Sequence, residues 1–186
     1  MAIGRRATAE APISAAQQHS SPFWRFSLRL YPAVAETCLA LQDRFGVDVN
    51  VLLFLLWAAE GGRKVDAEDA RRVIAAVESW NRTVVVPLRT VRRGLREPPE
   101  LVEPAAAERF RQRVKQVELE AERLQQEGLE RLVPRDGLGL PDASRDAAAR
   151  ANVEVYAEVL GTTFAPPLVA ALLVGFRRLE QDGPDE

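Results

Sequence analysis

The segment GVDVNVLLFLLWAAEGG, residues 46–62, contains nine consecutive apolar residues from position 51 to position 59. A helix over residues 49–59 would span roughly 16 Å at about 1.5 Å per residue. A bilayer core needs about 30 Å, so this segment is too short to cross a membrane. Asp48 or Asn50 can cap its start, and two glycines follow its end. A helix that is apolar on all sides is typical of a protein interior, and we predict the central helix of a soluble domain.

Helical patterns also precede this segment. Ser21 and Pro22 are suitable as the N-cap and the first residue of a helix, which we expect Pro32 to end. A second helix is predicted from there to Phe45, with apolar residues at spacings of three and four. Gly46 is placed to terminate it.

Further helices are predicted downstream. Asp66, with Asp69 three residues later, forms a variant of the capping box at the start of a helix that extends past Trp80. Pro87 removes a backbone hydrogen-bond donor, so we expect it to kink or split the continuation of that helix. The prolines of residues 97–104 indicate a loop.

The longest helix is predicted from about residue 105 to residue 132. Its apolar residues alternate spacings of four and three, the pattern of a helix packed along a partner. They are Phe110, Val114, Val117, Ala121 and Leu124. Residues 134–144 are expected to form a flexible loop. One helix then ends at Gly161, and a last one covers about residues 166–180. The only strand-like pattern is TVVV, residues 83–86.

These elements predict an all-α fold, a single-domain bundle of about seven or eight helices with one long helix. The domain covers residues 21–181 of the 186. Residues 1–20 lack periodicity and are expected to be a disordered leader, and residues 182–186 a disordered tail. Because no apolar segment follows the Arg5-Arg6 pair, we expect a cytoplasmic protein.

Few residues are available for catalysis. The net charge of −2 gives no overall attraction to nucleic acid or to acidic membranes. Cys38 is the only cysteine and lies among apolar residues, where it would be a small buried hydrophobe. His19 is the only histidine and lies in the leader. This largely removes Cys–His and Ser–His catalysis and histidine-based zinc sites. We therefore name no catalytic or metal-binding residue and expect no cofactor.

Four stretches carry a family resemblance. They are FWRFSLRLY (23–31), ETCLALQDRFGVDVNVLLFLLW (36–57), VVVPLRTVRRGLR (84–96) and RFRQRVKQVELEAERL (109–124). Their aromatic residues, Gly-x-Asp-Val-Asn and Pro-Leu-Arg resemble, in order and spacing, a family of proteobacterial conserved hypothetical proteins, domain of unknown function 2390. The resemblance covers about residues 22–132. It implies an all-helical bacterial protein and transfers no catalytic residue.

An arginine set is the first candidate for a binding surface. It comprises Arg82, Arg89, Arg92, Arg93 and Arg96. The last four share one face of a helix. Guanidinium groups suit phosphate or an acidic partner protein. The alternative is a solvated face that pairs with Glu97, Glu100 and the acidic long helix. That face lacks the interleaved aromatic residues that stack on bases.

Two further sets were considered. The glutamates are Glu118, Glu120, Glu122 and Glu127. A metal site in a helix bundle would pair such glutamates with Glu-x-x-His, so we expect a solvated acidic face. The aromatic residues are Trp24, Tyr31, Trp57 and Trp80. They could line a ligand pocket or a partner groove, although such residues are more often core.

The preferred function is a non-catalytic adaptor or regulatory module that binds a partner protein through a helix face. The arginine set is the preferred polar contact. The alternative is binding to RNA or nucleoprotein through Arg89, Arg92, Arg93 and Arg96. Small-molecule binding or an enzyme comes third. We expect no membrane partner. An exposed stripe on the long helix, or on the helix over residues 166–180, would suit a homodimer.

Overall fold

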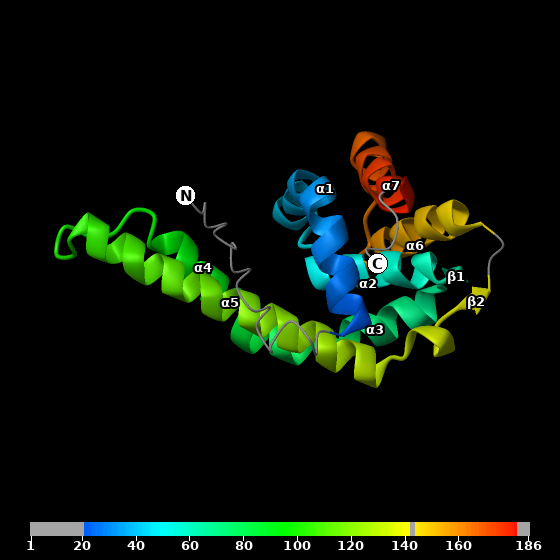
Figure 1. Cartoon of the computed structure of the whole chain (residues 1–186), viewed down its shortest axis with the longest axis horizontal. Helices are drawn as coiled ribbons and strands as arrows, with labels where there is room; N and C mark the ends of the chain where they lie inside the picture. The colour runs from blue at the N-terminus through cyan, green and yellow to red at the C-terminus, as the bar shows by residue number, and fades with distance from the viewer. Residues whose placement is uncertain (1–20, 142–143, 182–186) are drawn as a thin grey trace, which may run out of the picture.

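The computed structural model describes residues 21–141 and 144–181 (Figure 1). In chain order the elements are α1 (Pro22–Phe45), α2 (Val49–Glu60), β1 (Arg63–Lys64), α3 (Ala67–Trp80), the π-helical turn η1 (Asn81–Val85), α4 (Val86–Gly94), α5 (Pro104–Leu132), the 3-10 turn η2 (Arg135–Gly137), β2 (Leu140–Pro141), α6 (Arg145–Val159) and α7 (Pro166–Gln181). The fold is mostly all-α, as predicted, with one two-stranded sheet in the described ranges. The predicted leader, residues 1–20, and tail, residues 182–186, lie outside those ranges.

The number of helices differs from the seven or eight expected. Within the described ranges, α3, η1 and α4 follow one another without a break, so the α-helices form six separate rods. None of these helices is both long enough and apolar enough to cross a membrane.

Helix α2 is the centre of the core. Asp48 caps it, accepting hydrogen bonds from the backbone N–H groups of Asn50 and Val51, and every residue from 50 to 59 is buried. Helices α1, α3, α5 and α6 pack around it. Because each large apolar side chain buried here contributes about 1.5–3 kcal/mol, this helix anchors the whole domain.

Helix α1 continues through Pro32, so the prediction that Pro32 ends it was wrong. A proline inside a helix costs about 3 kcal/mol because its ring crowds the preceding turn and its N–H is missing. Pro32 lies on the exposed face of α1, which leaves room for its ring. On the opposite face, Phe26, Leu30 and Val34 are buried along the length of the helix, and this packing offsets the cost.

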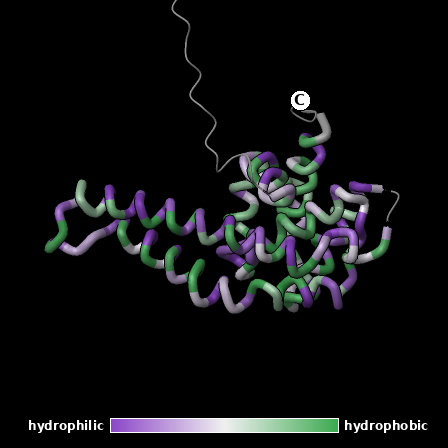
Figure 2. The backbone as a smooth tube through the Cα atoms, turned by 60° about the horizontal axis from the view of Figure 1, so that its bottom comes forward, coloured by the Kyte–Doolittle hydropathy of each residue, from purple (hydrophilic) through white to green (hydrophobic). Residues whose placement is uncertain are grey.

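An arm projects from the body of the molecule. We use this name for α4, the first half of α5 and the loop between them (Figure 1). Figure 2 shows polar and apolar residues intermixed along both of its helices. Pro87 does not split the helix into two. It lies near the start of α4 inside this continuous rod, directly after the π-helical turn η1, in which the Val86 N–H donates to the Asn81 carbonyl.

The segment expected to be a flexible loop, residues 134–144, carries short ordered elements in its described part. Strand β2 pairs antiparallel with β1, and Leu138 is fully buried. Gly139 has a φ of +59°, and a Cβ there would lie 2.1 Å from the carbonyl oxygen of Lys64, so only glycine fits. The strand-like TVVV stretch lies instead in η1 and at the start of α4.

Candidate functional site

A groove of about 720 Å³ lies between α1 and α2 on one side and α4 and α5 on the other. Its α1 wall is largely apolar and is made by Trp24, Leu28, Tyr31 and Leu39. Leu28, Tyr31 and Leu39 are exposed, so this wall is an apolar stripe that nothing in the described chain covers. Pro32 has no N–H, so the carbonyl of Leu28 also lacks its usual helical donor.

The opposite wall carries an ion-pair network. Arg89 donates from Nε to Glu118 Oε1 at 3.2 Å and from Nη2 to Glu122 Oε1 at 2.9 Å. Arg92 donates to both carboxylate oxygens of Glu118. Glu118 is only 5% exposed, so the expectation of a solvated acidic face was wrong for this residue. The sequence spacing could not show that α4 and α5 turn these charges toward each other.

Burial shifts the ionisation of two groups that line the groove from opposite walls. Desolvation raises the pKa of Glu122, with Arg89 opposing the shift and Glu118 adding to it. Desolvation also raises the pKa of Tyr31; Cys38 and the charge of Glu122 add to this shift, whereas the charges of Arg89 and Arg92 oppose it. The Tyr31 phenol on α1 therefore faces the ion-pair network across the groove.

The remaining cations leave the groove positively charged. Arg93 donates to Asp43 at 3.1 Å in an exposed pair. Arg96 and Lys115 line the groove and make no ion pair with any residue in the described ranges. The lining thus holds five cations against three carboxylates, those of Asp43, Glu118 and Glu122. Arg82 stands apart, beside a smaller pocket.

Polar side chains form part of the groove lining below these walls. Gln126 Nε2 donates to Asn50 Oδ1 at 2.7 Å, and both residues are buried. Gln126 Oε1 and Ser27 Oγ are also buried but have no hydrogen-bond partner among the described residues. Buried polar atoms are nearly always paired, so these two atoms are exceptions that the described residues leave unsatisfied.

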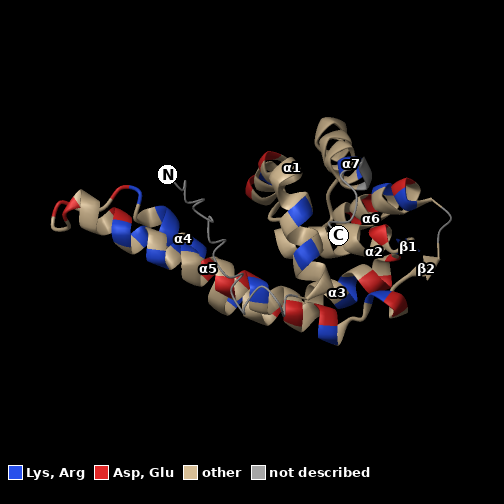
Figure 3. Ribbon diagram, viewed as in Figure 1, with Lys and Arg blue, Asp and Glu red and all other residues tan. Residues whose placement is uncertain are grey.

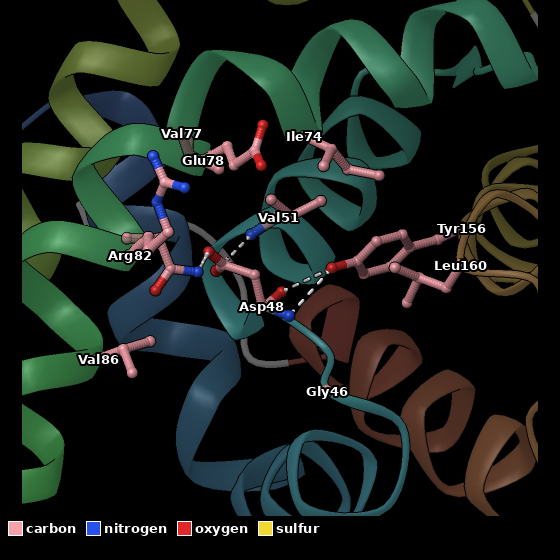
Figure 4. A pocket seen from close by; sticks show the side chains of 11 residues that line it. Gly46, Asp48, Val51, Ile74, Val77, Glu78, Arg82, Val86, Tyr156 and Leu160 are labelled. Atoms are coloured by element: carbon pink, nitrogen blue, oxygen red, sulfur yellow. Dashed lines mark hydrogen bonds between the residues drawn. The ribbon is translucent and has the colours of Figure 1, made fainter.

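The smaller pocket, of about 250 Å³, lies beside Asp48 (Figure 4). Besides capping α2, the Asp48 carboxylate accepts hydrogen bonds from Asn81 in η1 and from Gln125 in α5, the latter at 3.0 Å. The Tyr156 hydroxyl of α6 accepts from the Asp48 backbone N–H at 3.0 Å. Burial raises the pKa of Asp48, although the hydrogen bonds from Gln125 and from the backbone of Asn50 and Val51 oppose the shift. Asp48 thus joins the body to the base of the arm, a role beyond the predicted cap.

The four aromatic residues singled out in the sequence do not share one pocket. Trp24 and Tyr31 line the groove. Trp57 is in the core, with its ring 5.4 Å from that of Phe23. Trp80 lies against α5 and donates from Nε1 to the Ala121 carbonyl at 3.0 Å.

The charged side chains of the ion-pair network are already engaged with one another. Arg89, Arg92, Glu118 and Glu122 are engaged with one another, and the lining includes no cysteine or histidine. Cys38 lies in the core, where desolvation raises its pKa to about 12, so it is a thiol at neutral pH.

The part of the chain that matches a known family model contains the whole groove. Residues 22–129 match the model described as protein of unknown function (DUF2390). Every groove-lining residue falls within this range, whereas α6 and α7 lie beyond it. Comparisons with curated proteins and with solved structures gave no match. Since the match spans more than half of its length, the chain belongs to the DUF2390 family of proteins of unknown function.

Proposed function

We propose that the protein is a non-catalytic adaptor whose groove binds an acidic amphipathic helix of a partner protein. One observation carries this proposal: an exposed apolar wall on α1 stands opposite a wall with surplus positive charge on α4 and α5. A helix that is apolar on one side and acidic on the other matches both walls at once.

The apolar wall supports a helical occupant. Trp24, Leu28 and Tyr31 follow one another at spacings of four and three, so they form a straight stripe along α1. Apolar anchors of a partner helix recur with the same periodicity. The groove volume also falls within the roughly 300–1,000 Å³ that is usual for ligand sites.

The charges support an acidic occupant rather than RNA. Arg96 and Lys115 make no ion pair with the described residues and can receive carboxylates of the partner. Arg89 and Arg92, half of the set expected to bind RNA, already hold Glu118 and Glu122. Phosphates would have to displace or approach these glutamates, which costs binding energy.

Site-specific photo-crosslinking in the native cell tests the proposal. The photoreactive residue replaces Leu39 in the groove, and in the matched control it replaces Val174, which is equally exposed on α7. The expected result is a discrete protein adduct from position 39 only. Mass spectrometry of the crosslinked peptide should identify a segment that is apolar on one helical face and acidic on the other.

Charge reversal sharpens this test. Arg96→Glu combined with Lys115→Glu should abolish the adduct, whereas Arg150→Glu on α6 should not. The proposal would be overturned by equal labelling at positions 39 and 174, by an adduct to RNA, or by a captured segment that is basic.

A further inference from the structure

The outer side of α5 carries an apolar stripe that packs on nothing in the described chain. Phe110, Val117 and Leu124, here named the outer stripe, are 50%, 54% and 44% exposed. They are seven residues apart, which returns to nearly the same side of a helix every two turns. Of the five residues expected to pack along a partner helix, Val114 and Ala121 are buried within the chain, whereas these three residues are exposed.

The charges beside the outer stripe change sign halfway along it. At about 100° per residue, the stretch 109–127 places four charged residues on one flank, roughly 40–80° from the direction of Val117, and Arg131 lies on the same flank in the last turn of α5. Arg109 and Arg113 precede Val117, and Glu120 and Glu127 follow it. The two arginines make no ion pair within the described ranges, and the two glutamates pair only with Arg123 there. Figure 3 shows the charges along α5.

This arrangement is complementary to itself when a second copy is reversed. About a two-fold axis at Val117, Phe110 of one copy meets Leu124 of the other, and each Arg113 lies beside a Glu120. A parallel arrangement would instead turn this flank toward the opposite flank of the second copy, where Val114 and Ala121 lie, so the four charges would not meet one another. We propose that α5 forms the interface of a homodimer in which two outer stripes pack antiparallel across Val117.

The geometry of the arm agrees with this pairing. The arm is a two-helix hairpin that projects from the body (Figure 1), and two helices alone cannot cover their apolar residues. Val91 on α4 also remains 47% exposed. A second arm would supply the missing helices, as in an antiparallel bundle.

The dimer would leave both grooves open. Lys115, Leu119 and Gln126 line the groove from α5, and they lie roughly 160–200° around the helix from Val117. The interface and the groove are therefore on opposite sides of α5. The dimer is independent of the proposed function, but it would present two grooves to a partner and so increase avidity.

Cysteine crosslinking of the full chain tests whether the two-fold axis of the dimer passes through Val117. In Val117→Cys the two new thiols would meet at the axis, within reach of a short bismaleimide. Cys38 is buried, so the wild-type chain should react little. We expect a covalent dimer from Val117→Cys, and none from Val174→Cys, a matched exposed control on α7. Equal yields from the two variants would overturn the proposal.

A charge swap tests the antiparallel direction by sedimentation equilibrium. Arg113→Glu and Glu120→Arg alone should each weaken dimerisation about tenfold or more, because each creates two like-charge contacts per dimer. The double variant should recover the wild-type affinity, and Arg150→Glu should leave it unchanged. A wild-type chain that stays monomeric, or a double variant that does not recover, would overturn the dimer. Neither result affects crosslinking from Leu39, which tests the groove separately.

Discussion

Glu118 on α5 holds Arg92 on α4 through both carboxylate oxygens, and it does so while buried. Arg89 donates to the same carboxylate at 3.2 Å. Glu118 therefore pairs with two guanidinium groups that form one wall of the groove, and Glu122 supplies the second negative charge through Arg89. Removing one partner of such a network leaves a buried charge without compensation.

We therefore predict that Glu118→Ala lowers the free energy of unfolding by about 3 kcal/mol. Glu154→Ala is the control, because Glu154 pairs with Arg150 on the surface of α6, away from both the groove and the proposed dimer interface. That change should cost less than about 0.5 kcal/mol. Urea denaturation of both variants measures the difference. Equal costs would show that the buried network adds nothing to the attachment of α4.

Asp48 should make the stability depend on pH. Its pKa is raised by burial above the ordinary value of 3.8, so the native state holds the Asp48 proton more tightly than the unfolded chain does. The resulting stability is fully present below the unfolded pKa and is lost as the pH rises through the raised native pKa. Asp48→Asn removes this titration while keeping a good N-cap residue.

The measurement is urea denaturation of both proteins from the ordinary carboxylate range to neutral pH. The free energy of unfolding of the wild type should fall with rising pH relative to that of Asp48→Asn. Glu122 titrates in both proteins, but Asp48→Asn removes the Asp48 charge that helps to raise the pKa of Glu122, so its contribution cancels only in part. Two parallel curves would mean that the Asp48 carboxylate is not desolvated in the native state.

Much of the fold could be predicted from local sequence. The composition of residues 49–59 identified the core helix, and the caps at Ser21, Asp48 and Asp66 marked helix starts that the structure contains. Pro32 misled this reasoning because the packing of α1 offsets a local penalty, and the periodicity of the sequence carries no measure of that packing.

The candidate site was harder to predict. The arginine set and Tyr31 were identified as candidates, but their partners lie far away in the sequence. Arg89 meets Glu122 across 33 residues, and Gln126 meets Asn50 across 76. The groove exists only because the arm and α1 diverge from the same core, an arrangement that depends on contacts between distant elements.

Two helical glycines should respond in opposite ways to alanine. At Gly128 on α5, a Cβ would meet nothing within 4 Å. Gly128→Ala should therefore stabilise the protein by about 0.5–1 kcal/mol, since alanine favours the helix. At Gly175 on α7, a Cβ would lie 2.4 Å from Cγ1 of Val34 on α1. Gly175→Ala should thus destabilise by about 1–3 kcal/mol. Thermal unfolding of both variants checks the contrast, and a stabilising Gly175→Ala would show that α1 and α7 can separate freely.

Leu28 and Leu30 lie about 200° apart around α1, so one faces the groove and the other faces the core. Leu28 is 55% exposed on the groove wall, whereas Leu30 is fully buried. Leu28→Glu should change the free energy of unfolding by no more than about 0.5 kcal/mol. It should nevertheless abolish the adduct formed from position 39, because an acidic side chain in the apolar wall repels an acidic partner. Leu30→Glu should instead prevent folding, since it buries an unpaired carboxylate. Circular dichroism establishes folding and crosslinking measures binding. A folded Leu28→Glu chain that still captures the partner would place the binding surface elsewhere.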